Sequence, residues 1–142
     1  MPPRPTSASD LPDVVPIFPL TGALLLPFAH RPLNIFEPRY IEMIDFALAT
    51  DRLIGLVQPE DKSEESPPGQ APLHRIGCLG RITHFEESGD GRYFIILEGV
   101  SRFVVGDEVA GEQRFRRARI STTGYEGDFV RNEGESAVDR QR

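Results

Sequence analysis

The sequence predicts a mainly β fold (α+β), in which a twisted and partly closed antiparallel sheet carries one early amphipathic helix. Three observations lead to this prediction. Apolar runs of strand length recur along the chain, glycine-rich turns separate them, and a helical period of apolar residues occurs once, in residues 39–50. Short strands between turn residues are typical of sandwiches and barrels. A chain of 142 residues has the length of one domain.

The first predicted strand, Val14–Pro19, is apolar and contains two prolines, Pro16 and Pro19. Proline has no backbone N–H to donate to a neighbouring strand, and within sheets it is found mainly on edge strands. We therefore expect this strand to lie at a sheet edge or to leave the sheet early. A turn at Thr21-Gly22 and a short apolar run, Ala23–Leu26, follow it.

A second strand, Pro32–Phe36, leads into the predicted helix, Arg39–Thr50. Pro38 fits the first helical turn, where its missing N–H has no partner to lose. Phe46 lies off the apolar stripe of the helix, and we expect it to cover a neighbouring loop. The stripe follows the spacing i, i+3, i+4, i+7, i+8 and consists of Tyr40, Met43, Ile44, Ala47 and Leu48.

The later strands alternate with turns. Phe94–Leu97 is continuously apolar, as expected of a strand covered on both sides or lining a closed sheet, and Gly99–Arg102 is expected to turn the chain. The predicted strands are Leu53–Gln58, Ile76–Phe85, Arg92–Glu98, Phe103–Val105 and Arg114–Thr122, with a hairpin loop at Glu86–Gly91. The predicted core residues are Ile44, Phe94, Ile96, Leu97 and Phe103.

The chain ends differ from this central region in composition. Residues 1–13 are rich in proline and serine and predict a disordered lead-in, while residues 14–122 are expected to form the domain. Within it, Pro59–Pro72 is long and polar for a connection, which predicts a mobile loop. Residues 123–142 are expected to be a linker and the start of a truncated helical segment, because Ser136–Asp139 matches the helix-start pattern [ST]-x-x-[DE] three residues before the last residue.

Composition excludes several classes of function. The net charge of −6 argues against non-specific nucleic-acid binding, which needs a surplus of basic side chains. The single cysteine, Cys78, cannot form an internal disulfide, and with His30, His74 and His84 it lacks the spacing of a metal site. We therefore predict no metal and no cofactor. The sequence contains neither a signal peptide nor an apolar run of membrane-spanning length, so we expect a cytoplasmic protein without a membrane partner.

The only lysine, Lys62, lies in the acidic stretch Glu60–Glu65. A phosphate-binding loop of the type G-x-x-x-x-G-K-[ST] requires a lysine after glycine, and a Ser–Lys hydrolytic dyad requires a lysine that loses its proton easily. Neighbouring carboxylates make a lysine hold its proton more tightly. No G-x-S-x-G nucleophile elbow occurs either. We therefore expect no enzymatic activity.

Two stretches, Val15–Phe28 and Leu33–Tyr40, contain an apolar strand with an internal proline–leucine step, a proline-marked turn, and the motif L-x-I-F-E-x-R-Y at the helix entrance. In order and spacing the sequence resembles the N-terminal, substrate-binding domain of Lon-type proteases, particularly its stand-alone bacterial versions. The resemblance extends from Val14 to about Ile120 and implies a PUA-like pseudo-barrel followed by a helical segment. It further implies a non-catalytic module that recognises unfolded or extended polypeptide, alone or together with a separate protease.

The candidate binding surface joins the first strand and its turn to the helix entrance. An extended peptide can add to an exposed strand edge, and exposed apolar patches on soluble domains mark interaction sites. Glu37 and Arg39 could equally hold the helix to the sheet, and Tyr40 could belong to the core. The candidate residues are Ile17, Leu25, Phe28, Phe36, Glu37, Arg39 and Tyr40.

An alternative function is that of a PUA-like domain binding RNA or a small ligand. Its basic face would be the arginine cluster of the last strand, which consists of Arg114, Arg116, Arg117 and Arg119. The overall negative charge opposes this alternative, because binding to phosphates needs basic side chains in excess. The electrostatic surroundings of these arginines distinguish the two functions.

Overall fold

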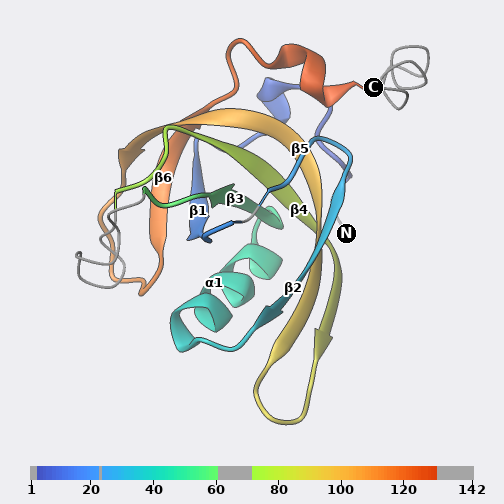
Figure 1. Cartoon of the computed structure of the whole chain (residues 1–142), viewed down its shortest axis with the longest axis vertical. Helices are drawn as coiled ribbons and strands as arrows, with labels where there is room; N and C mark the ends of the chain where they lie inside the picture. Colours follow the sequence, from blue (N-terminus) through green and yellow to red (C-terminus); the bar gives the residue numbers. More distant parts are fainter. Residues whose placement is uncertain (1–2, 23, 61–71, 131–142) are drawn as a thin grey trace.

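The computed structural model describes residues 3–22, 24–60 and 72–130. Six strands form one sheet in the order β2-β5-β4-β3-β1-β6, and β6 also pairs with β5, so that strands close into a ring (Figure 1). The prediction of a mainly β fold with one early helix is confirmed. The elements are η1 (Ala8–Asp10), β1 (Val14–Pro19), β2 (His30–Ile35), α1 (Pro38–Ala49), β3 (Leu53–Val57), β4 (Ile76–Glu87), β5 (Tyr93–Glu108), β6 (Arg116–Ser121) and η3 (Glu126–Phe129).

Strand β1 lies inside the sheet, so the prediction of an edge strand is wrong. It pairs in parallel with β3 through residues 17–19 and antiparallel with β6 through residues 14–17. Pro16 precedes the part paired with β3, and Pro19 follows the part paired with β6. Each proline therefore lies where β1 has a partner strand on one side only. The N–H that proline lacks would point to the other side, where no partner strand needs it. The parallel β1–β3 pair also departs from the expected all-antiparallel sheet.

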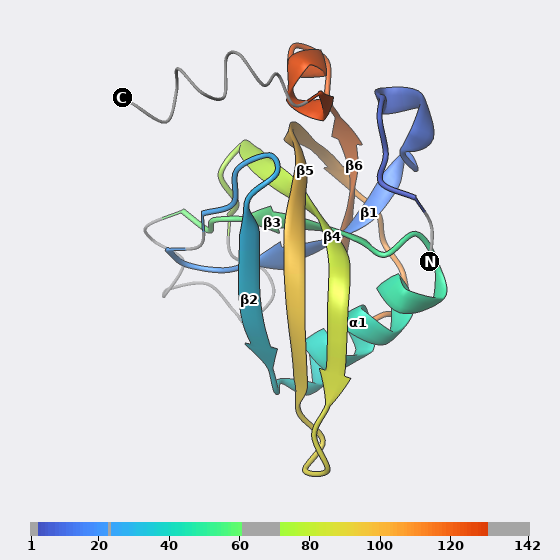
Figure 2. The same cartoon turned by 90° about the vertical axis from the view of Figure 1, so that its right-hand side faces the viewer.

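Strand β5 is a single strand of 16 residues, where the sequence predicts two strands separated by a turn at Gly99–Arg102. Its first half pairs with β2 and its second half with β6, while β4 runs alongside both halves (Figure 2). Gly99 lies at a shift in the β4–β5 register. A Cβ at this position would overlap the carbonyl oxygen of Leu26. The glycine thus marks a close approach between two segments, and the strand continues through it.

Two buried clusters fill the fold. One lies between α1 and the sheet, where Met43, Ile44 and Ala47 are fully buried. The other lies inside the ring around Phe103 and Ile17. The helix begins at Pro38, and its apolar stripe faces the sheet as the spacing predicts. Outside that stripe, the Phe46 ring packs against the Phe115 ring at 5.4 Å between centroids, so Phe46 covers the segment before β6 as expected.

The predicted core is confirmed in part. Ile44, Leu97 and Phe103 are fully buried, whereas Phe94 and Ile96 are half-buried. The reason is the alternation of side chains along a strand: Ile95 and Leu97 face the core, and Phe94 on the opposite face packs against the His84 ring at 5.9 Å between centroids. One face of this part of β5 is therefore covered, rather than both.

The ends of the domain also contribute contacts. A disordered lead-in was expected over residues 1–13. In its described part, Arg4 forms an ion pair with Glu98 at 2.7 Å, and its guanidinium lies 3.9 Å from the centre of the Phe28 ring. Phe129 of η3 is buried in the cluster inside the ring. Most of the predicted loop 59–72 and the predicted helix start at 136–139 lie outside the described residues. No helix in the described ranges is long and apolar enough to cross a membrane.

Candidate functional site

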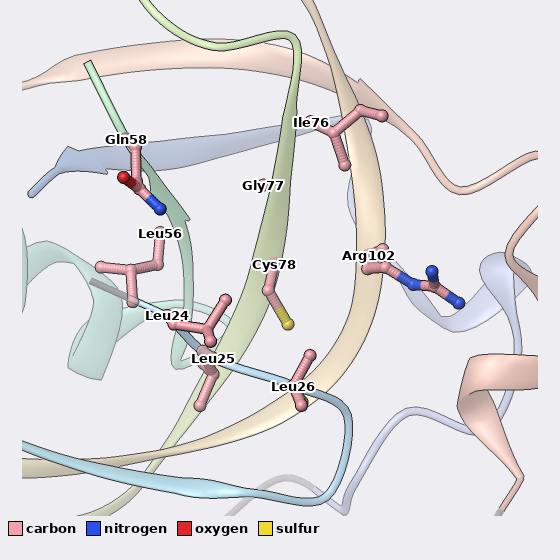
Figure 3. A pocket seen from close by; sticks show the side chains of 9 residues that line it. All are labelled: Leu24, Leu25, Leu26, Leu56, Gln58, Ile76, Gly77, Cys78 and Arg102. Atoms are coloured by element: carbon pink, nitrogen blue, oxygen red, sulfur yellow. The ribbon is translucent and has the colours of Figure 1, made fainter. Parts of the chain in front are cut away.

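A groove on the outside of the ring collects exposed apolar side chains. Leu24, Leu26 and Ile76 are 66%, 54% and 48% exposed, and all three line one hollow of about 150 Å³. We call this hollow the leucine groove (Figure 3). Its lining consists of Leu24, Leu25, Leu26, Leu56, Gln58, Ile76, Gly77, Cys78 and Arg102.

The segment between β1 and β2 forms one wall of the leucine groove. It is held against β5 by two backbone hydrogen bonds, in which Phe28 N–H donates to Gly99 O (2.8 Å) and Gly99 N–H donates to Ala29 O (2.9 Å). Phe28 adopts a positive φ of 67°, a conformation that residues with a Cβ rarely adopt. Because the chain turns here, Leu25 is buried while Leu24 and Leu26 stay exposed beside it.

The floor of the leucine groove is formed where β3 and β4 lie close together. A Cβ at Gly77 would lie 2.6 Å from Leu56 O, so only glycine permits this spacing. Figure 3 shows the sulfur of Cys78 turned toward the leucine segment. Burial, as the largest cause, raises the pKa of the Cys78 thiol to about 12. The thiol is therefore neutral at physiological pH and adds an apolar surface rather than a nucleophile.

Arg102 lines the groove, but its charge is already neutralised. Its Nε and Nη2 donate to the two carboxylate oxygens of Asp128, each at 2.9 Å, and its backbone N–H donates to the same carboxylate at 3.0 Å. These hydrogen bonds hold the pKa of Asp128 below its usual value. Figure 3 shows the Arg102 side chain pointing away from the leucines. This pair joins η3 to β5 beside the groove.

A second, wider hollow of about 420 Å³ continues from the leucine groove, because both are lined by Gln58 and Ile76. His74 and Arg75 complete its lining, and both are exposed. We call it the arginine hollow. Across the described parts of the chain, no carboxylate forms an ion pair with Arg75.

A third hollow, of about 310 Å³, lies where β1 and β2 end and α1 begins, and it contains Phe36, Glu37, Arg39 and Tyr40 from the predicted site. We call it the corner pocket. Phe36 is 64% exposed at its rim. Arg39 Nε donates to Glu37 at 3.1 Å, and Tyr40 packs on Phe18 at 4.5 Å between ring centroids. The pocket combines an exposed aromatic ring with an internally paired charge.

The remaining predicted site residues do not join the corner pocket. Ile17 is fully buried within the ring and Leu25 is 5% exposed, so both were wrongly expected to face solvent as a patch. Phe28 lies beneath the guanidinium of Arg4. Sequence reasoning missed Leu24, Leu26 and Ile76 as groove residues. The leucine run was visible in the sequence, but which of its members faces outward depends on the turn at Phe28.

The arginine cluster of β6 is partly neutralised by carboxylates. Arg114 pairs with Glu42 at 3.1 Å and Arg116 with Glu108 at 2.6 Å, and Phe115 between them is buried. This leaves fewer free guanidinium groups for phosphates than the sequence suggests. In the part of the chain that the structure describes, no three His, Cys, Asp or Glu side chains gather as metal ligands would.

The corner pocket includes the side chains of the motif that enters α1, and comparison with known sequences gives the family. A sequence profile of the ATP-dependent protease La (LON) substrate-binding domain matches residues 14–139. The chain belongs to the Lon substrate-binding domain family. The match extends past residue 122, where the domain was expected to end.

Lon proteases are among the relatives of this Lon substrate-binding domain. It is 32% identical over 119 residues to Lon protease 2 of Myxococcus xanthus, covering 84% of this chain and 14% of that protein. It is 31% identical over 119 residues to a Lon protease of Anaeromyxobacter dehalogenans, with the same coverage of 84% and 14%. The chain thus spans about one seventh of the length of these relatives.

Solved structures support the same fold. A crystal structure of a Lon N-terminal domain protein from Xanthomonas campestris superposes with a TM-score of 0.59 at 27% identity, covering 76% of this chain and 58% of that chain. The N-terminal domain of a Mycobacterium avium complex Lon protease gives a TM-score of 0.60 at 15% identity, covering 77% of this chain and 54% of that one. At that identity, the second comparison bears on the fold alone.

Proposed function

We propose that this Lon substrate-binding domain is a non-catalytic module that binds extended, apolar-rich polypeptide, and that the leucine groove is its main contact surface. The observation that carries the proposal is the gathering of Leu24, Leu26 and Ile76 around one hollow. Exposed apolar patches of this kind mark interaction sites on soluble domains. Family membership supports a polypeptide as the ligand, since the matching profile describes a substrate-binding domain.

The physical basis of binding is burial of apolar side chains. A groove of about 150 Å³ accommodates one or two side chains of a passing chain, so the interface is small. A flexible peptide must also lose conformational freedom when it binds. We therefore expect a micromolar or weaker affinity, on the order of −8 kcal/mol or less in magnitude. Such weak binding suits a module that samples many unfolded chains.

The corner pocket is a secondary contact in this proposal. Phe36 at its rim offers an exposed aromatic ring, and Glu37, Arg39 and Tyr40 fix the pocket's shape through the contacts described above. A separate protease as a working partner is a further part of the proposal.

The test is titration of a fluorescent, uncharged, leucine-rich peptide followed by anisotropy, comparing the wild-type domain with Leu26→Ser. Leu26 is 54% exposed, so the substitution removes groove surface at little cost to folding. We expect about tenfold weaker binding, which corresponds to about 1.4 kcal/mol. Because no phosphate contact is involved, the affinity for this peptide should hardly change with salt.

Val130→Ser is the matched control, because Val130 is 67% exposed and is not part of the leucine groove. A second variant, Gly99→Ala, displaces the leucine segment without altering any apolar side chain, since its Cβ would overlap Leu26 O. Gly89→Ala, with open space around the added Cβ, controls for it. Peptide binding that is equal in wild type and Leu26→Ser, or tight salt-sensitive RNA binding without a peptide response, would refute the proposal.

A further inference from the structure

We infer that the polypeptide preferred by this domain carries an acidic side chain close to its apolar anchor, and that the guanidinium of Arg75 pairs with that carboxylate. The inference rests on the proposed function, because it places the apolar anchor in the leucine groove. It adds a chemical class of substrate that family membership does not specify. The arginine hollow is the second half of the binding surface.

Continuity of the two hollows sets the distance between anchor and acid. The leucine groove and the arginine hollow share the walls made by Gln58 and Ile76, and Arg75 directly precedes Ile76. An extended chain advances about 3.3 Å per residue. A peptide whose apolar side chain contacts Ile76 therefore presents its next one to three residues, roughly, to Arg75.

The charges around the groove favour an acidic partner over a basic one. Arg102 on one side is paired with Asp128 through two hydrogen bonds of 2.9 Å, and this carboxylate offsets its charge. On the other side, Arg75 joins no ion pair among the described residues. Glu60, two residues beyond Gln58 along the chain, forms no ion pair with Arg75 either. Of the two arginines among the described residues that line these hollows, Arg75 is thus the one without an ion pair. Guanidinium groups bind carboxylates through two parallel hydrogen bonds.

Apolar surface beside an uncompensated cation also disfavours basic peptides. A lysine or arginine next to the apolar anchor would bring a like charge to Arg75, which destabilises the complex. An acidic residue in the same place gains an ion pair at a partly exposed site. Such pairs contribute a modest amount, so the charge selects among peptides while the groove provides most of the binding.

The experiment uses the full 142-residue chain and three short fluorescent peptides that differ at one position after a leucine pair, where they carry Glu, Gln or Lys. We expect the Glu peptide to bind wild type about three- to fivefold more tightly than the Gln peptide, the upper part of the range of an exposed ion pair. Arg75→Gln should abolish this difference, and Arg75→Glu should make the Lys peptide the preferred one. Raising the salt from about 0.05 M to about 0.5 M should reduce the Glu preference.

Arg92→Gln is the matched control for loss of one positive charge. Arg92 lies beyond the far end of β4, a strand of 12 residues that begins directly after Arg75. The Arg92→Gln variant should therefore keep the preference for the Glu peptide. Equal binding of Glu and Gln peptides by wild type, or an Arg92→Gln effect equal to that of Arg75→Gln, would overturn the inference. In either case, weaker binding of all peptides by Leu26→Ser would leave the proposed function intact. If Leu26→Ser binds all of them as wild type does, the proposed function fails as well.

Discussion

Phe103 shows how much of the fold depends on one side chain. It is the largest of the fully buried residues and belongs to the cluster inside the ring, together with Val15, Ile17 and Val57. Side chains from β1, β3, β4, β5 and β6 make up this cluster. Removing a buried ring costs its transfer free energy and leaves a cavity.

Phe103→Ala should therefore lower the free energy of unfolding by about 3–5 kcal/mol. Phe94→Ala is the comparison, because Phe94 is half-buried and packs on the edge of His84; it should cost about 1 kcal/mol, the centre of the range for point substitutions. Urea denaturation followed by circular dichroism measures both. Equal losses for the two variants would mean that the two faces of β5 have been assigned wrongly.

The run Leu24–Leu26 shows where residue-level prediction ends. Its apolar character was plain from the sequence, and a role at the surface was expected for Leu25. The structure instead buries Leu25 and exposes Leu24 and Leu26. Outside a regular strand or helix, no period tells which side chains face inward. The deciding features are the positive φ of Phe28 and the contact with Gly99, which is distant in sequence.

At the scale of elements, η3 is attached to the ring by Asp128. Its carboxylate accepts three hydrogen bonds from Arg102, at 2.9–3.0 Å, and Arg102 also lies over the Tyr125 ring at 4.7 Å. Hydrogen bonds from Arg102, the largest cause, lower the pKa of Asp128 in the folded state. A carboxyl with a lowered folded pKa stabilises the fold above its unfolded pKa, and this contribution is lost as the pH falls through the folded pKa.

Asp128→Asn should thus destabilise the domain by about 1–2 kcal/mol near neutral pH. This lies toward the low end of the ~1.5–3 kcal/mol usual for hydrogen bonds to charged groups, because the Arg102 side chain is 50% exposed. The difference between variant and wild type should shrink as the pH falls below the ordinary value of 3.8. Thermal melts across this pH range measure it, with Asp107→Asn as the control because Asp107 is exposed. A destabilisation that stays constant down to strongly acidic pH would show that the charge of Asp128 is not responsible.

The elements themselves were largely predictable from the sequence, and their partners were not. The helix at Pro38–Ala49 and the strands β2, β3 and β4 follow from local periodicity and turn residues. Strand pairing is different, because it depends on segments far apart in the chain. Pro16 and Pro19 do limit the hydrogen bonds of β1, as expected. A free sheet edge is one way to meet this limit, and the structure uses another, in which β3 and β6 each pair with only part of β1. The continuity of β5 through Gly99 was hidden for the same reason.

At the scale of the whole molecule, net charge and local charge act differently. The chain carries −6, which would repel acidic peptides and RNA alike at long range. At physiological salt, charges separated by more than about 8 Å are largely screened. We therefore expect the local guanidinium of Arg75 to decide which peptide charge the arginine hollow prefers, and the net charge to limit contact with extended phosphate backbones.

The chain as a whole should turn over neither ATP nor polypeptide. Incubated with ATP and casein, the purified domain should bind unfolded protein but release neither phosphate nor peptides above a buffer control. The reason is chemical: its only lysine, Lys62, stands in the sequence among Glu60, Asp61, Glu64 and Glu65, where carboxylates favour the protonated form. Neither the nucleotide-binding lysine of a phosphate loop nor the deprotonated lysine of a hydrolytic dyad is available. Phosphate release measured by a colorimetric assay and casein cleavage measured by gel electrophoresis provide the check. Activity that survives repurification and is lost in Lys62→Ala would contradict a purely binding role.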